Sequence, residues 1–165
     1  MPRLAALRPA SLLLWLALGF AGGAGAQQEP PPLDLASYPR TELTIAQAKP
    51  AAVHEFRVWV ADTEPRAQQG LMFVRDLPEN QGMIFPLDPP RVENMWMKNT
   101  YVELDMLFID TGGRVVKIIE RAHPLLLDNL SSGGPVAAVL ELKGGLAAKL
   151  GLRAGDKVSW KKPAP

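Results

Sequence analysis

The stretch LDMLFIDTGGRVVKII, residues 104–119, decides the fold class that this chain predicts. Two apolar runs rich in β-branched and aromatic residues, 104–109 and 115–119, flank the polar sequence Asp110-Thr111-Gly112-Gly113. Aspartate and glycine between two such runs are typical of the tight turn that joins antiparallel strands. The stretch therefore predicts a β-hairpin.

Similar short segments occur on both sides of the hairpin. Alternation of apolar and polar residues predicts a half-buried strand over residues 53–61, and residues 62–65 carry the capping, acidic and proline residues that begin a helix. A second short helix is predicted over residues 144–150, ended by Gly151. Further strands are predicted over residues 82–85, a stretch from 94, 102–109, 136–142 and 157–160. Many short strands with two short helices predict a mainly β fold, a compact antiparallel β-sandwich or barrel.

The two ends of the chain differ in composition from its middle. Arg3 and Arg8 precede an apolar run over residues 11–20 and small residues over 21–26, which is the order found in a secretory signal peptide. Proline-rich sequence follows and predicts an extended linker. The expected organisation is a signal peptide 1–26, a Pro-rich linker 27–42, a single β-rich domain 43–160 and a flexible tail 161–165. The mature protein is therefore expected to be periplasmic or secreted.

Composition excludes several classes of function. The chain has no cysteine, so it has no disulfide, thiol nucleophile or thiolate metal ligand. Its formal net charge of +1 becomes −1 when Arg3 and Arg8 leave with the signal peptide, so no nucleic-acid partner is predicted. No amphipathic basic helix is predicted, and no membrane span would remain after signal cleavage. The histidines, His54 and His123, lack metal-ligand spacing, and no metal or cofactor is predicted.

Polar groups interrupt the apolar pattern just before the hairpin, in the sequence NMWMKNT, residues 94–100. In an extended chain, Met95 and Met97 would share one face, while Trp96 and Lys98 would share the other. An indole beside an ammonium group forms a surface that can bind a ligand. This stretch is therefore the centre of the candidate site.

Two carboxylates in predicted strands extend that site. Alternation places Asp105 and Glu141 on faces that also carry apolar residues, so both are expected to be partly desolvated and to need a partner. The candidate ligand-binding residues are Arg66, Trp96, Lys98, Asn99, Thr100, Asp105 and Glu141. The same residues would also suit an internal network of ion pairs and hydrogen bonds that fixes strand ends. The sequence leaves both interpretations open.

Three functional hypotheses follow from these residues. The leading one is a non-catalytic exported domain that binds a small polar, sugar-like or anionic ligand, or an envelope partner protein. The second is a carboxylate-based hydrolase that uses Asp105 and Glu141. The third is a thioether site for Cu(I) at Met95 and Met97, against which stands the usual role of methionine as a gap-filler in small cores. No catalytic residue is identified.

Several short motifs occur in a fixed order along the chain: Thr63-Glu64-x-Arg66-x-x-x-Gly70-Leu71-Met72, Gly82-Met83-Ile84-Phe85, Trp96-Met97-Lys98-Asn99-Thr100, Leu104-Asp105 with Phe108-Ile109-Asp110, Val139-Leu140-Glu141-Leu142, Gly145 and Gly155-Asp156. In this order they resemble the bacterial and archaeal family called domain of unknown function 192, over residues 43–160. The resemblance implies a compact, mainly β domain of sandwich or barrel type with two small helices, often exported. It implies no established activity, substrate or cofactor.

Overall fold

The computed structural model of the protein describes residues 31–161. Contacts along the chain group the residues from Pro32 onward into one compact unit, which holds every helix and strand described below. The predicted signal peptide, the first part of the predicted linker and most of the predicted tail lie outside the described residues. Over residues 31–161, no helix has the length and apolar character needed to cross a membrane.

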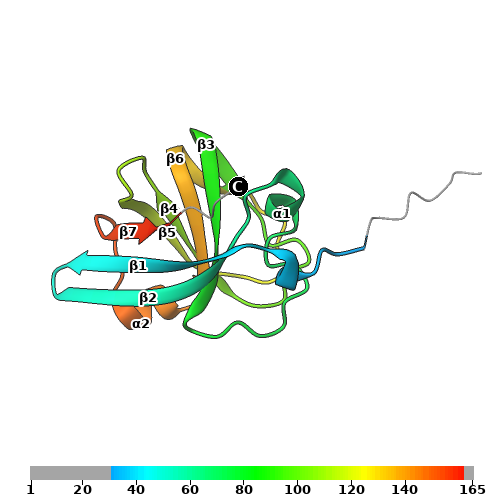
Figure 1. The fold of residues 1–165 in the computed structure, drawn as a ribbon, viewed down its shortest axis with the longest axis horizontal. Coiled ribbons are helices and arrows are strands. Elements are labelled where there is room, and N and C mark those ends of the chain that lie inside the picture. Colours follow the sequence, from blue (N-terminus) through cyan, green and yellow to red (C-terminus); the bar gives the residue numbers. More distant parts are fainter. Residues whose placement is uncertain (1–30, 162–165) are drawn as a thin grey trace, which may run out of the picture. The chain divides into compact units, whose positions relative to one another are not determined.

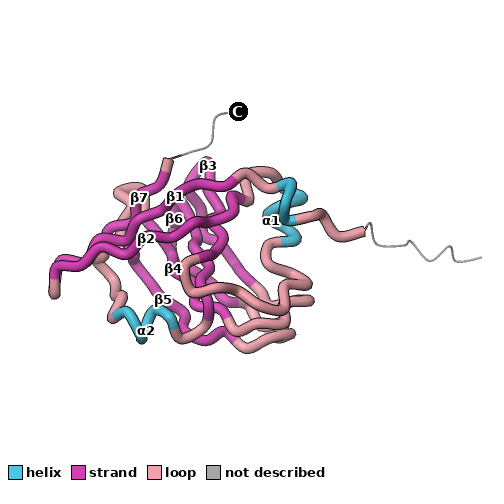
Figure 2. Tube along the Cα trace, turned by 60° about the horizontal axis from the view of Figure 1, so that its bottom comes forward, coloured by secondary structure: helices cyan, strands magenta, loops and turns pink. Residues whose placement is uncertain are grey.

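Seven strands and two short α-helices follow one another in this unit (Figure 1). A single 3-10 turn, η1 (Leu35–Ser37), precedes them. The helices are α1 (Glu64–Gln69) and α2 (Leu146–Leu150), and Figures 1 and 2 show them at opposite ends of the domain. The strands are β1 (Arg40–Ala48), β2 (Ala51–Val60), β3 (Gln81–Met95), β4 (Leu104–Ile109), β5 (Val115–Ala122), β6 (Leu130–Lys143) and β7 (Lys157–Trp160).

The predicted hairpin is confirmed as the antiparallel pair β4 and β5. Its turn is closed by hydrogen bonds from the Arg114 amide, which donates to Asp110 Oδ1 at 2.8 Å, and from the Gly113 amide, which donates to the Asp110 carbonyl at 2.9 Å. Gly113 has a φ of +74°, in the left-handed region that glycine adopts without strain. The aspartate and glycine that predicted the turn therefore form it directly.

All seven strands belong to one sheet in the order β5-β4-β6-β3-β2-β1-β7. The mainly β fold is confirmed, and its neighbouring strands are antiparallel except for β2 and β3, which run parallel. A parallel pair needs a long crossover connection, and the segment that contains α1 supplies it. The edge strands β5 and β7 meet at one end through a bridge between Arg114 and Lys157, so the sheet curls without closing.

Both faces of the central strands are covered, which divides the core in two. Every residue of β4 is buried, because a strand packed on both faces needs apolar side chains on each. One face contributes to an inner cluster that includes residues of all seven strands and of α2, among them Leu107, Leu140 and Leu146. The other face contributes to an outer cluster that includes Met83, Met106 and loop residues.

Three local expectations differ from the structure. Residues 27–42 were predicted to be linker, yet Tyr38 is buried in the outer cluster and β1 begins at Arg40. The strand predicted from residue 94 ends at Met95, because Asn99 takes a φ of +54° and turns the chain. The second helix, predicted over residues 144–150, begins only at Leu146, after Gly145 with a φ of +82°.

Gly82 of β3 lies against the backbone of β6, and its replacement provides a test of this sheet register. A Cβ atom at Gly82 would lie 2.3 Å from the Glu141 carbonyl oxygen and 2.8 Å from Leu142 Cδ2. We expect Gly82→Ala to lower the free energy of unfolding by about 3 kcal/mol, since overpacking of a core costs about that much. Gly134→Ala is the control, because nothing lies within 4 Å of a Cβ there. Equal urea midpoints for the two variants would contradict the register.

Candidate functional site

Asp105 is fully buried on the inner face of β4 and accepts hydrogen bonds from three backbone amides. Its Oδ1 accepts from the amides of Arg121, at 2.8 Å, and Gly145, at 2.9 Å. Its Oδ2 accepts from the Ala147 amide at 2.6 Å. The carboxylate therefore joins the end of β5 to the first turn of α2, and three amides satisfy it without a cation.

Glu141 lies on the opposite face of the sheet from Asp105. In the β4–β6 register, Asp105 pairs with Leu142, an inner-cluster residue, while Glu141 pairs with Met106 of the outer cluster. Two carboxylates that act on one glycosidic bond must flank that bond from one cleft. The hydrolase hypothesis based on Asp105 and Glu141 does not fit this geometry.

The surroundings of Glu141 are apolar. It also pairs with Met83 across the β3–β6 register, so a fully buried methionine lies on each side of it. Its side chain is buried, and its Oε2 has no hydrogen-bond partner. Desolvation raises the pKa of Glu141 from the usual 4.5 to about 8. At neutral pH the group is therefore mainly a neutral carboxylic acid.

Residues 97–100 form a turn that is hydrogen-bonded to the loops around residues 73 and 125. The Thr100 amide donates to the Met97 carbonyl at 3.1 Å, and the Phe73 amide donates to the Asn99 carbonyl at 2.9 Å. Thr100 is buried, Lys98 and Asn99 are half-buried, and Thr100 Oγ1 donates to the Lys98 carbonyl at 3.3 Å. The backbone of this predicted site is therefore engaged in a structural junction.

Arg66 lies on α1 and binds neighbours within its own region. Its Nη1 is 2.6 Å from Asp62 Oδ1, and its Nη2 donates to the Ser37 carbonyl at 3.1 Å. The guanidinium also lies over the Tyr38 ring, 5.5 Å from its centroid. This arrangement attaches the segment before β1 to α1 and gives Arg66 a structural role.

The methionines of the Cu(I) hypothesis do not form an exposed pair. Met97 is fully buried in the outer cluster, and Met95 is half-buried against the same cluster. Met83 and Met106 are fully buried there as well. These positions agree with the gap-filling role of methionine in a core. Within residues 31–161, no group of three or more His, Cys, Asp or Glu side chains is placed to hold a metal ion.

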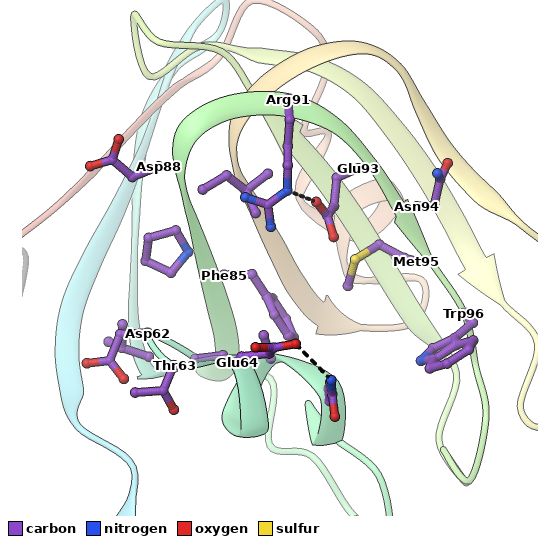
Figure 3. A pocket seen from close by; sticks show the side chains of 16 residues that line it. Asp62, Thr63, Glu64, Phe85, Asp88, Arg91, Glu93, Asn94, Met95 and Trp96 are labelled. Atoms are coloured by element: carbon purple, nitrogen blue, oxygen red, sulfur yellow. Dashed lines mark hydrogen bonds and ion pairs between the residues drawn. The ribbon is translucent and has the colours of Figure 1, made fainter.

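A cavity of about 710 Å³ lies between the start of α1 and the second half of β3 (Figure 3). Of the predicted ligand-binding residues, only Trp96 lines it. Figure 3 shows Arg91 and Glu93 on one side, Asp62, Thr63 and Glu64 on the other, and Trp96 at one end. The lining residues are Val60, Ala61, Asp62, Thr63, Glu64, Ala67, Gln68, Phe85, Pro86, Leu87, Asp88, Arg91, Glu93, Asn94, Met95 and Trp96.

The charged groups of the cavity are mainly acidic. Four carboxylates line the cavity together with the guanidinium of Arg91, whose Nε lies 2.9 Å from Glu93 Oε2, while Asp62 Oδ1 lies 2.6 Å from Arg66 Nη1. Gln68 Nε2 donates to Glu64 Oε1 at 3.3 Å. The Trp96 side chain remains 51% exposed. The cavity can therefore offer hydrogen-bond acceptors, amide donors and an aromatic face to a ligand.

The sequence analysis missed most of these lining residues. Residues 86–94 contain three prolines and many polar residues, which predicts a loop, whereas the structure continues β3 through them with irregular pairing to β6. Alternation from Arg91 to Asn94 was the available signal. It was too short to distinguish a strand from a polar loop.

Asp105→Asn tests the structural role of the carboxylate. An asparagine oxygen can replace Oδ1, but the amide NH₂ would then face the Ala147 N–H group, which donates to Oδ2 at 2.6 Å. We expect a loss of about 2–3 kcal/mol in the free energy of unfolding, as for a buried donor left without an acceptor. Asp128→Asn, on an exposed loop, is the control. A urea midpoint for Asp105→Asn equal to that of Asp128→Asn would show that the three hydrogen bonds do not stabilise the fold.

The raised pKa of Glu141 should make the free energy of unfolding depend on pH. Its folded-state pKa of about 8 exceeds the usual 4.5, so its favourable contribution is complete below pH 4.5 and is lost as the pH rises to about 8. We expect Glu141→Gln to gain stability relative to the wild type by about 3 kcal/mol between pH 5 and pH 8. The exposed Glu120→Gln on β5 removes the same charge as a control. Urea unfolding at both pH values measures this difference. An equal pH dependence of the two variants would refute the raised pKa of Glu141.

Comparisons with known proteins agree on the family and leave the activity open. The family model DUF192, described as "Uncharacterized ACR", matches residues 44–160. A solved structure from Sinorhizobium meliloti 1021, described as a candidate transcription regulator, is 37% identical, with a TM-score of 0.73 over 75% of this chain and 95% of that one.

A second solved structure, a protein of unknown function from Novosphingobium aromaticivorans DSM 12444, is similar over a larger share of this chain. It is 36% identical and covers 81% of this chain and 94% of that one, with a TM-score of 0.74. No curated protein shows a significant match. Because the family model spans most of the domain, the chain belongs to the DUF192 family.

Proposed function

We propose that the cavity between α1 and β3 binds a small hydroxyl-rich, sugar-like ligand without catalysis. The observation that carries this proposal is the half-exposed Trp96 indole at one end of a cavity that is lined by both apolar and polar side chains. A flat aromatic face can stack on the apolar side of a sugar ring, while carboxylates and amides accept and donate hydrogen bonds at its hydroxyl groups.

The size and floor of the cavity support a small ligand. Its volume of about 710 Å³ lies within the range typical of small-molecule sites. Phe85 and Leu87, both of the outer cluster, contribute apolar surface to the lining. Apolar surface with a few polar groups around it is the usual composition of a site that holds a ligand.

The charge of the lining favours a neutral ligand over an anion. Asp62, Glu64, Asp88 and Glu93 carry four negative charges, of which Glu93 pairs with Arg91 and Asp62 pairs with Arg66 of α1, so acidic groups still outnumber basic ones. An anion would therefore be repelled, whereas hydroxyl groups can donate to these carboxylates. Of the polar, sugar-like and anionic ligands considered for this chain, the sugar-like ligand is the best match.

We also propose that the domain acts in the periplasm or outside the cell. The support is the order of basic, apolar and small residues over positions 1–26. Cell-envelope fragments and free sugars are the hydroxyl-rich molecules that such a domain would meet.

Trp96→Ala tests the binding proposal. A thermal-shift screen of the protein against neutral, amine-bearing and acidic sugars should identify stabilising ligands, and a ligand at a hundred times its dissociation constant should stabilise by about 2.7 kcal/mol. We expect Trp96→Ala to weaken binding at least tenfold in calorimetric titration, which corresponds to about 1.4 kcal/mol. Tyr101→Ala, an exposed aromatic that does not line the cavity, should bind normally. A screen without any stabilising sugar would refute the proposal.

A further inference from the structure

Five of the exposed large apolar side chains lie on three loops that are hydrogen-bonded to one another. Phe73 is 41% exposed, Tyr101 39%, Leu125 56%, Leu126 41% and Leu127 71%. We call this set the three-loop patch, because its members come from the loops that follow α1, the turn at 97–100 and β5. Adjacent exposed apolar side chains on a soluble domain often mark an interaction site.

Backbone hydrogen bonds hold the three loops together. The Met97 amide donates to the Leu126 carbonyl at 3.0 Å, and the Leu125 amide donates to the Thr100 carbonyl at 3.2 Å. The first loop joins them through the Phe73 amide, and the Phe73 and Tyr101 rings meet edge to face with centroids 6.4 Å apart. The leucines and the aromatic pair therefore form one surface.

Two residues of the patch have an unfavourable backbone conformation. Phe73 has a φ of +68° and Leu125 a φ of +65°. Bulky residues seldom adopt this left-handed region, and backbone strain of this kind is typical of functional loops. Both amides are held by the hydrogen bonds between the loops, so the fold fixes these side chains in exposed positions instead of letting them turn inward.

We propose that the three-loop patch inserts into a phospholipid surface. Its five residues lie on loops, and none of them lines the cavity between α1 and β3. Leucine and aromatic side chains on protruding loops can enter the region between headgroups and acyl chains. This surface is made by loops, so it does not require the amphipathic helix that the sequence lacks.

The charges around the patch match a zwitterionic headgroup. Arg75 lies over the Tyr101 ring at 4.7 Å and can reach a phosphate. Asp128 is exposed next to the same loops, where it can face headgroup amines, and the exposed Asp76 lies 4.0 Å from Lys143 Nζ. Cations and anions on one rim complement a headgroup that carries both signs, and they give little preference for an anionic membrane.

The absence of cysteine allows a site-specific test in the full chain. Leu127→Cys carries an environment-sensitive fluorophore on the patch, and Val116→Cys, at an apolar position of β5 that is 46% exposed, carries the same fluorophore as a control. With phosphatidylcholine vesicles we expect a blue shift and an intensity increase at position 127 and neither at position 116. Added phosphatidylglycerol should change the response little.

The design separates insertion of the patch from attachment through the N-terminal apolar run. Attachment alone would leave both probes in water, and an unchanged spectrum at position 127 overturns the proposal. Equal shifts at both positions also overturn it, since the contact would not be specific to the patch. Leu125→Asn in the chain labelled at position 127 should reduce the blue shift of the probe several-fold while it preserves the fold, because asparagine tolerates a positive φ. An unaltered blue shift in that variant would likewise contradict insertion.

Discussion

The carboxylate of Asp105 is the interaction on which the arrangement of this domain depends. It lies on the buried inner face of β4 and accepts hydrogen bonds from the amides of Arg121, Gly145 and Ala147. A carboxylate with three amide donors is well satisfied, so its burial does not require a neighbouring cation. Because these donors come from β5 and α2, one side chain connects an edge strand to the helix that follows β6. This connection holds the edge of the sheet whose opposite face carries the outer cluster.

Local chemistry was sufficient to predict part of this fold. Asp110 and Gly113 identify the hairpin because both act within a few residues of their own position. The partners of Asp105 lie up to 42 residues further along the chain, so no local pattern contains them. Alternation could show that Asp105 was buried, whereas only the strand register shows what satisfies it. The same limit applies to Glu141, whose placement on the opposite face depends on how β4 pairs with β6.

The cavity could not be predicted from the sequence for a related reason. Its two walls come from α1 and from β3. Helix α1 lies in the crossover that connects the parallel strands β2 and β3. Residues such as Asp62 and Glu93 are ordinary surface residues by composition, and they become opposing groups only when the crossover places α1 beside β3. Glu141 illustrates the converse. It attracted attention as a strand carboxylate, yet its methionine neighbours give it the character of a neutral core residue.

The segment 94–101, chosen from its unusual mixture of polar and apolar residues, connects the cavity to the three-loop patch. Trp96 lines the cavity, Met97 is buried in the outer cluster and Tyr101 belongs to the patch. The left-handed turn at Asn99 allows this change of direction, because a continuous strand would alternate these side chains across one sheet. A ligand that moved Trp96 would act on a segment that is hydrogen-bonded to Leu126 through Met97. The side chain that lines the cavity and the loop that carries Leu126 are therefore joined through one short turn.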